Sequence, residues 1–191
     1  PEDLASLLTK QVQKKDGQNS ECPLFEFWKG AGDELLFSVA VEERRHVRHY
    51  VIAFLKTVKQ YDDALTKRKL KIGLKATAWL AGFPVGNAKV PLPSMSDPPS
   101  GENQPKPKIV WDYVGPNIDI GFRLTKFSNR RKFVLSTELA LVLANGDWSA
   151  HEATFHYDGR AQLKGVLNDE PYPIIWLDMG SSANERIEET L

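Results

Sequence analysis

Residues 42–65 carry the pattern that most restricts how this chain can fold. Apolar side chains recur there every three or four positions, and arginine, lysine and glutamate fill the positions between them. This period places the apolar residues on one stripe of a helix. They are Val47, Tyr50, Val51, Phe54, Leu55, Val58 and Tyr61. The segment predicts the longest helix of the chain, with one face in the core.

Segments of high β-propensity lie before and after this helix. Residues 25–27 and 35–39 flank a stretch, 29–33, in which two glycines permit a tight turn, so they predict a hairpin with a polar tip. Further strands are predicted over 69–83, 109–114 and 132–135, and a closing hairpin over 154–157 and 161–178. Shorter helices are predicted over 1–15, 117–127 and 137–143. This order predicts one α/β or α+β domain without an internal repeat.

Two segments are predicted to lack regular structure. Residues 90–108 are rich in proline, serine and polar side chains, which favour a loop. The polar residues 181–191 are expected to fray at the end of the chain.

Composition limits the classes of function. The 191 residues, 41% of them hydrophobic, suffice for one domain with a single core, which we assign to 1–191. Lysine and arginine number 25, as do aspartate and glutamate, so no net field attracts nucleic acid or an acidic membrane. Any phosphate binding is therefore expected to be local.

Cysteine usage and hydropathy indicate the compartment. The lone Cys22 has no partner for an internal disulfide or for a thiolate metal site. No apolar run approaches the length of about 20 residues that a membrane span needs, and residues 1–3 do not resemble the start of a signal peptide. We expect a soluble, cytoplasmic protein.

Polar residues at turns and helix starts are the candidates for chemistry. Asp119 and Arg123 are four positions apart in the predicted helix 117–127 and so share a face. Taken alone, an exposed ion pair is the simpler interpretation of these two residues. Lys29 and Asp33 in the same way fit an ordinary polar hairpin turn.

Together these pieces resemble the class III nucleotide cyclases. The hairpin of that family reads Lys-x-x-Gly-Asp, as residues 29–33 do, and its later strand and helix read Asp-x-x-Gly-x-x-x-Asn-x-x-x-Arg, which residues 112–123 follow with Asp119 in place of the asparagine. Residues 70–74, 132–136 and 163–166 are similar to three further strands and turns. The resemblance covers about residues 20–178. It implies an α+β, ferredoxin-like fold whose central, mainly antiparallel sheet is flanked by helices, acting as a homodimer.

The resemblance also implies roles for single residues. Asp33 corresponds to one carboxylate of a two-metal site for Mg²⁺ or Mn²⁺, and Arg123 to the arginine that meets charge on the α-phosphate in the transition state. Lys164 corresponds to a ligand of the terminal phosphates. The interpretation that it is an ordinary exposed lysine of a hairpin is equally good. Asp119 either accepts from a ribose hydroxyl or holds Arg123 in position.

Lys29 and Asp112 fall at the positions that read the base. One cationic donor and one acceptor fit the edge of adenine, cytosine or uracil, so the pair does not select among them. Trp28, Trp111 and Tyr113 lie beside the pair in sequence. These rings either narrow a pocket towards a pyrimidine or fill the core.

The segments 25–33 and 111–124 most resemble the bacterial pyrimidine cyclases of Pycsar antiphage systems. A member of this group would convert UTP or CTP into the 3′,5′-cyclic mononucleotide and pyrophosphate. The product would be a second messenger, read by a separate effector. The alternatives are a purine (adenylate) cyclase, a non-catalytic nucleotide-binding or dimerisation module, and an α/β domain with chance agreement.

The sequence departs from the family pattern in three places. The family's first strand, which carries a second metal-binding aspartate, is expected before residues 1–15 and is missing from this chain; we favour truncation over a degenerate relative. Leu74 and Lys75 stand where a histidine is common, and 90–108 has the character of an insertion. In the family the metal carboxylates and the base-reading and arginine groups come from different subunits, which implies a head-to-tail homodimer.

Overall fold

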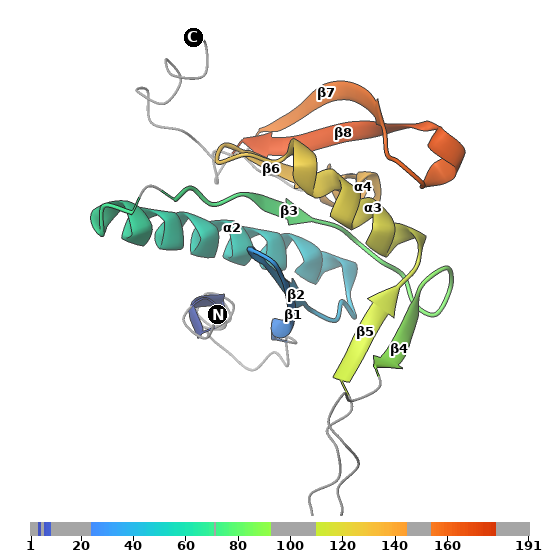
Figure 1. Ribbon diagram of the computed structural model, residues 1–191, viewed down its shortest axis with the longest axis horizontal. Coiled ribbons are helices and arrows are strands. Elements are labelled where there is room, and N and C mark those ends of the chain that lie inside the picture. The colour runs from blue at the N-terminus through green and yellow to red at the C-terminus, as the bar shows by residue number, and fades with distance from the viewer. Residues whose placement is uncertain are drawn as a thin grey trace, which may run out of the picture.

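The computed structural model describes residues 4, 6–8, 24–70, 72–92, 110–144 and 154–178. Figure 1 shows the arrangement of its elements. In chain order these are β1 (Glu26–Ala31), β2 (Glu34–Ser38), α2 (Arg44–Lys67), β3 (Ala76–Ala78), β4 (Ala88–Leu92), β5 (Val110–Val114), α3 (Pro116–Leu124), the 3₁₀ turn η1 (Thr125–Phe127), β6 (Lys132–Leu135), α4 (Thr137–Ala144), β7 (Phe155–Gln162), the 3₁₀ turn η3 (Leu167–Asp169) and β8 (Pro171–Asp178).

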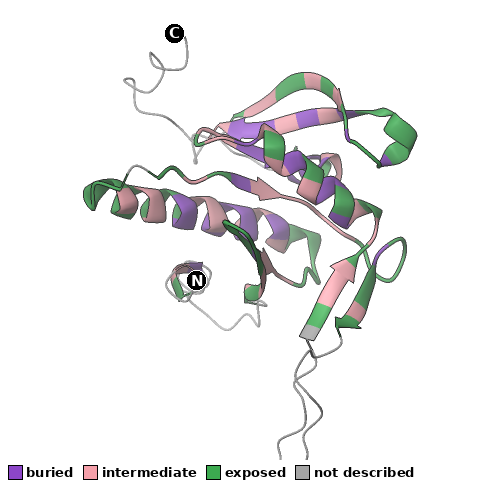
Figure 2. Cartoon of the chain, viewed as in Figure 1, coloured by how far each residue is buried: buried purple, intermediate pink, exposed green. Residues whose placement is uncertain are grey.

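A four-stranded sheet forms the centre of the molecule. Its strand order is β3-β6-β8-β7, with β3 parallel to β6 and the other pairs antiparallel. Phe133 and Leu135 of β6 pack with α2 and α4, whereas Val134 between them packs with α3. All three are fully buried because helices cover both faces of the sheet. Figure 2 shows the buried residues concentrated on the sheet and on the adjoining helix faces. The predicted α+β fold, with a mainly antiparallel sheet flanked by helices, is confirmed.

Two antiparallel ribbons stand outside this sheet. One is the predicted hairpin β1–β2, and the other pairs β4 with β5. In Figure 1 the β4–β5 ribbon extends away from the body of the domain. The rings of Phe25 and Tyr50, with centroids 5.8 Å apart, join the start of the first ribbon to α2. An isolated two-stranded ribbon is marginally stable, so this contact with α2 helps to hold the β1–β2 ribbon in place.

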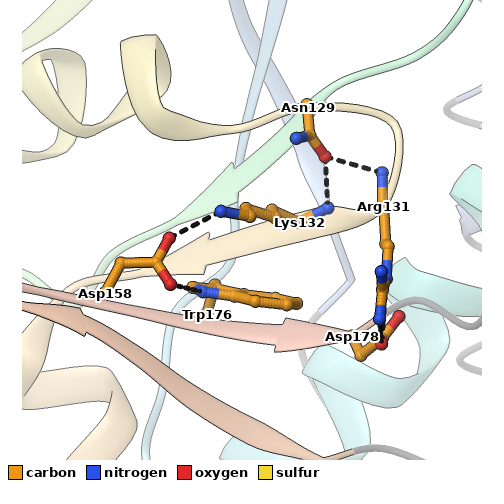
Figure 3. A network of polar contacts seen from close by, with 6 residues as sticks. All are labelled: Asn129, Arg131, Lys132, Asp158, Trp176 and Asp178. Atoms are coloured by element: carbon orange, nitrogen blue, oxygen red, sulfur yellow. Dashed lines mark hydrogen bonds and ion pairs between the residues drawn. The ribbon is translucent and has the colours of Figure 1, made fainter. Parts of the chain in front are cut away.

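A polar network fastens the antiparallel strands at one end of the sheet (Figure 3). Lys132 Nζ contacts Asp158 Oδ2 at 2.6 Å, and the indole nitrogen of Trp176 donates to Asp158 Oδ1 at 2.9 Å. Arg131 and Asp178 form a second ion pair at 2.6 Å. Desolvation raises the pKa of Asp158, but the bonds from Lys132 and Trp176 outweigh it and leave the pKa below its ordinary value. The network therefore links β6, β7 and β8 through side chains as well as backbone.

Within the described residues of the predicted strand over 69–83, only Ala76–Ala78 form a strand, so the rest of this prediction is wrong there. That strand lies at a sheet edge beside β6. On either side of it, side chains instead of a neighbouring strand bind the backbone. Leu74 N donates to Asp62 Oδ1 at 3.3 Å, and Leu80 N donates to Ser136 Oγ at 3.2 Å. These side-chain acceptors replace the ladder that a longer strand would need.

The predicted loop over 90–108 is wrong at its start, because β4 extends through Leu92 and pairs with β5. Proline has no backbone N–H to donate to a sheet and is therefore found on edge strands. Pro91 is tolerated because β4 pairs with β5 on one side only. Residues 93–109 lie outside the described residues. In the closing hairpin, β7 is longer than predicted and β8 is shorter, with a turn over 163–170 between them.

The remaining predictions agree with the structure where it describes them. The helices over 42–65, 117–127 and 137–143 and the strands over 109–114 and 132–135 are present within a few residues, the second helix ending in the turn η1. Residues 4 and 6–8 of the predicted helix over 1–15 are helical, and Leu8 is fully buried. Cys22 and the tail 181–191 lie outside the described residues. Within the described part of the chain, no helix combines the length and apolarity needed to span a bilayer.

Candidate functional site

The structure brings together Lys29 and Asp112, which the sequence assigned to base reading. They are 83 residues apart, on β1 and β5, and Lys29 Nζ lies 2.7 Å from Asp112 Oδ1 and 2.9 Å from Oδ2. The side chains are 33% and 19% exposed, respectively. The two ribbons therefore meet through a partly buried ion pair that solvent can still reach.

Asp112 accepts two further hydrogen bonds. The indole nitrogen of Trp28 donates to Oδ1 at 3.0 Å, and the backbone nitrogen of Tyr113 donates to the same atom at 2.9 Å. Desolvation raises the pKa of Asp112, but these bonds and the Lys29 ammonium outweigh it, so the pKa lies below its ordinary value. Asp112 is therefore ionised at neutral pH and acts only as an acceptor.

Aromatic rings surround this pair. The Trp28 ring contacts Tyr113 and Phe122, with centroids 4.9 Å and 6.0 Å apart, and Tyr113 contacts Phe83 at 5.4 Å. Lys29 Nζ lies 4.5 Å from the centroid of the Trp28 ring. Trp28 and Tyr113 are partly buried beside the ion pair, whereas Trp111 is 44% exposed. Of the three rings that the sequence pointed to, two border the pair.

A contact between a side chain and the backbone makes Arg123 and Lys164 neighbours. Arg123 Nε on α3 donates to the backbone oxygen of Lys164, in the turn after β7, at 2.9 Å. This bond fixes the plane of the guanidinium. The terminal nitrogens of Arg123 make no hydrogen bond or ion pair within the described residues, and both side chains are exposed. The terminal nitrogens of Arg123 could donate to an anionic group at this position.

Asp119 does not pair with Arg123, although the two are four positions apart on α3. Its side chain is exposed, and no hydrogen bond or ion pair joins it to another described residue. The bond to the Lys164 carbonyl takes the place of the predicted helical ion pair. The simpler interpretation of these two residues is thus wrong.

Asp33 is exposed at the turn between β1 and β2. Its side chain likewise forms no hydrogen bond or ion pair with another described residue. Two metal ions need several oxygen ligands. Among the described residues, no three histidine, cysteine, aspartate or glutamate side chains are grouped to hold one. The described residues by themselves do not form a metal site. Binding of Mg²⁺ or Mn²⁺ therefore stays a prediction.

Sequence reasoning missed two residues that contact α3, the helix that carries Arg123. Asn87 is buried in the turn before β4 and bonds to Asn117 at the start of α3. Trp79 follows β3, and its ring packs against Gly121 and contacts Phe122, with centroids 5.7 Å apart. The dipeptide Gly86-Asn87 signals a turn. No local pattern connects either residue with α3, so the sequence alone had no signal for these contacts.

Comparison with known proteins identifies the fold. No protein-family model and no curated protein matches the sequence. The structure is similar to that of the adenylyl cyclase CyaB from P. aeruginosa, with a TM-score of 0.53 and 14% identity over 95% of this chain and 83% of that chain. It is also similar to the guanylyl cyclase Cya2, with a TM-score of 0.52 and 13% identity over 95% of this chain and 81% of that one. The chain thus has the fold of these nucleotide cyclases.

Proposed function

We propose that this chain is the catalytic domain of a nucleotide cyclase that converts UTP or CTP into the 3′,5′-cyclic mononucleotide and pyrophosphate. The observation that carries the proposal is the meeting of Lys29 and Asp112. These residues were singled out by two separate motifs, and their side chains lie 2.7 Å apart. The shared fold and the Arg123–Lys164 neighbourhood support it.

The base would bind at the Lys29–Asp112 pair. An ionised Asp112 accepts from an N–H on the base, and the ammonium of Lys29 donates to a neighbouring oxygen or ring nitrogen. Uracil offers N3–H beside O4, and cytosine offers its exocyclic amine beside N3. Binding requires the two side chains to part, since they now bond to each other. The base thereby replaces an internal ion pair.

We propose a pyrimidine because rings border the pair closely. The Trp28 and Tyr113 centroids lie 4.9 Å apart, and Phe122 lies beyond Trp28. Such rigid groups limit the size of a base that can enter. Adenine offers a similar donor and acceptor, so size would decide between the two classes.

The phosphates would bind at Arg123 and Lys164. In the reaction the ribose 3′ oxygen loses its proton to solvent and attacks the α-phosphorus, and the bond from that phosphorus to the leaving pyrophosphate breaks. Arg123, its plane held by the Lys164 carbonyl, donates to the α-phosphate as charge builds there. Lys164 would bind the terminal phosphates, and Asp119 would accept from a ribose hydroxyl or orient Arg123.

The active form would be a head-to-tail homodimer in which Asp33 of one subunit and Arg123 of the other serve the same site. We further propose that the product is a second messenger in antiphage defence, made in the cytoplasm and read by a separate effector. The resemblance of residues 25–33 and 111–124 to pyrimidine cyclases supports this part.

A panel of substrates tests the activity and the base preference together. The full-length protein is incubated with each of the four ribonucleoside triphosphates in Mg²⁺ or Mn²⁺, and products are identified by mass. Cyclic UMP or cyclic CMP is the expected product. Cyclic AMP or cyclic GMP as the main product would contradict the pyrimidine preference, and no cyclic product from any of the four would contradict the enzyme.

Arg123→Ala tests the assignment of the phosphate site. We expect kcat to fall about 100-fold or more with a smaller change in KM, because a fixed donor to the transition state is lost. Lys126→Ala, which removes an exposed cation one turn later, is the matched control and should keep its turnover. Equal activity in the Arg123 variant would refute its role.

A non-catalytic nucleotide-binding module is the second candidate, favoured by one observation. Asp33 lies in no group of metal-binding side chains among the described residues. Such a module would bind a triphosphate in calorimetric titration without turning it over. A cyclase would show both binding and product.

A further inference from the structure

We infer that Asn87 is a positioning residue, which sets the start of α3 against the β4–β5 ribbon and so holds Arg123 in register with Asp112. The inference rests on the proposed function, in which these two residues contact opposite ends of one nucleotide. Asn87 itself touches neither the base nor the phosphates in this scheme. It acts through the elements that carry those residues.

The amide of Asn87 binds α3 directly. Oδ1 accepts from the backbone nitrogen of Asn117 at 3.2 Å, and Nδ2 donates to Asn117 Oδ1 at 2.9 Å. Nδ2 also donates to the carbonyl of Gly82 at 2.9 Å. The residue is 2% exposed. One buried side chain therefore joins the turn before β4 to the first turn of a helix 30 residues later.

Helix α3 needs this contact because its own sequence has no side chain to cap it. Its N-cap is Gly115, which makes no side-chain hydrogen bond, and Pro116 follows at the first helical position. The N–H groups of a first turn have no partner within the helix and require one from elsewhere. Asn87 supplies it for Asn117, as a cap from a distant part of the chain.

The fit at this junction leaves little freedom. Gly115 has φ of 137°, and a Cβ built there would lie 2.5 Å from Asn87 Oδ1 and 2.5 Å from the Gly86 carbonyl. The backbone of Gly115 is thus pressed against the Asn87 turn, and a larger residue would force the two apart. The close approach therefore limits how far the start of α3 can shift towards the turn before β4.

This junction lies between the two halves of the candidate site. Asp112 is three residues before Gly115 on β5, and β4 begins directly after Asn87, with Ala88 opposite Val114. Arg123 is six residues after Asn117 on α3. A rotation of α3 at its start would therefore move the guanidinium relative to the base-reading carboxylate. Errors of about 1 Å in such spacing can reduce turnover about 100-fold.

The test compares Asn87→Ala with a variant that loses stability elsewhere. Ile52→Val trims a buried residue of α2, in the core on the other face of the sheet, and is the matched control. Asn117→Asp keeps an acceptor for Asn87 Nδ2 and leaves the backbone nitrogen in place, so it is the conservative variant. Thermal unfolding, steady-state kinetics and amide exchange at Asn117 are measured for each full-length protein.

We expect Asn87→Ala to exchange the Asn117 amide faster and to lose about 100-fold in kcat, with a smaller change in KM. Ile52→Val should lower the unfolding midpoint about as much as Asn87→Ala does, but it should keep kcat within about threefold of the original value. Asn117→Asp should also stay within about threefold of the original kcat. Asn117→Ala, which removes one of the two acceptors of Asn87 Nδ2, serves if Asn87→Ala does not fold, and a smaller loss of about tenfold in kcat is expected of it, because the Asn117 amide still donates to Asn87 Oδ1.

Two results would overturn the inference while leaving the proposed function intact. One is an unchanged kcat in Asn87→Ala, or in Asn117→Ala where that variant replaces it, despite faster exchange at residue 117. The other is an equal loss of kcat in Ile52→Val, which would mean that lowered stability alone reduces turnover. If the unmutated protein produces no cyclic nucleotide from any triphosphate, the proposed function fails first and the positioning role falls with it.

Discussion

At the scale of single residues, Asp112 shows how neighbours settle the chemistry of a group. Lys29, Trp28 and the Tyr113 amide all donate to one carboxylate, so its ionised form is favoured although burial opposes it. The same three donors give the Asp112 carboxylate, the proposed acceptor for the base, a defined orientation. An exposed aspartate such as Asp33 has no such constraint.

The lowered pKa of Asp112 predicts a pH dependence of stability. A carboxyl group whose pKa is lower in the folded state stabilises the fold above its ordinary pKa, and this contribution is lost as the pH falls through the folded-state value. The free energy of unfolding should therefore fall below about pH 4. Asp112→Asn should lower it by about 1–3 kcal/mol at pH 7 and flatten this acid slope.

Chemical denaturation at pH 7, 4 and 3 measures the effect. Part of the acid slope should remain in Asp112→Asn, because the pKa of Asp158 is also lowered by hydrogen bonds from Lys132 and Trp176 that outweigh its burial. Asp63→Asn, at an exposed position of α2, is the control and should follow the original curve. Identical acid slopes for the original protein and Asp112→Asn would contradict the assignment.

At the scale of elements, two close approaches set the position of α3. Asn87 fixes its start, and Trp79 lies against its middle at Gly121. A Cβ built on Gly121 would lie 2.1 Å from Cδ2 of Trp79. A glycine in a helix interior usually lowers stability relative to alanine. Here it permits the close contact between α3 and Trp79, which follows β3.

Gly121→Ala should therefore destabilise the domain by about 1–3 kcal/mol, since the overpacking against an indole outweighs the gain in helix propensity. The unfolding midpoint measures the change. Gly82→Ala is the matched control, because nothing lies within 4 Å of a Cβ built there, and it should stay within about 0.5 kcal/mol. A Gly121→Ala protein as stable as the original would show that Trp79 moves aside freely.

At the scale of the whole molecule, the proposed dimer predicts complementation between inactive variants. Asp33→Ala and Arg123→Ala damage different subunits' contributions to a site. Equal mixing with free exchange makes about half the dimers mixed, each with one intact site of two, so about a quarter of the original activity should return. Product formation before and after mixing measures it.

Lys29→Ala mixed with Arg123→Ala is the control for this experiment. Both residues are proposed to come from the same subunit to a given site, so no mixed dimer has an intact site and activity should stay low. Recovery in this control, or none in the first mixture, would contradict the head-to-tail arrangement.

The local sequence determined most of the elements and the candidate residues. The apolar period over 42–65, the glycines at 30 and 32 and the Gly115-Pro116 step act through neighbouring residues, so they are readable without a structure. The motif spacings named Lys29 and Asp112 as a pair. They did so through a resemblance, since nothing near either residue indicates the other.

The tertiary structure alone decided which of these groups meet. Strand β4 pairs with β5, and Asp62 and Ser136 bind the backbone on either side of β3. Arg123 bonds to the Lys164 carbonyl instead of Asp119, and Asn87 caps a helix 30 residues away. Each contact joins residues distant in sequence. Such contacts depend on how the elements pack, and packing leaves no period or spacing in the local sequence from which to predict them.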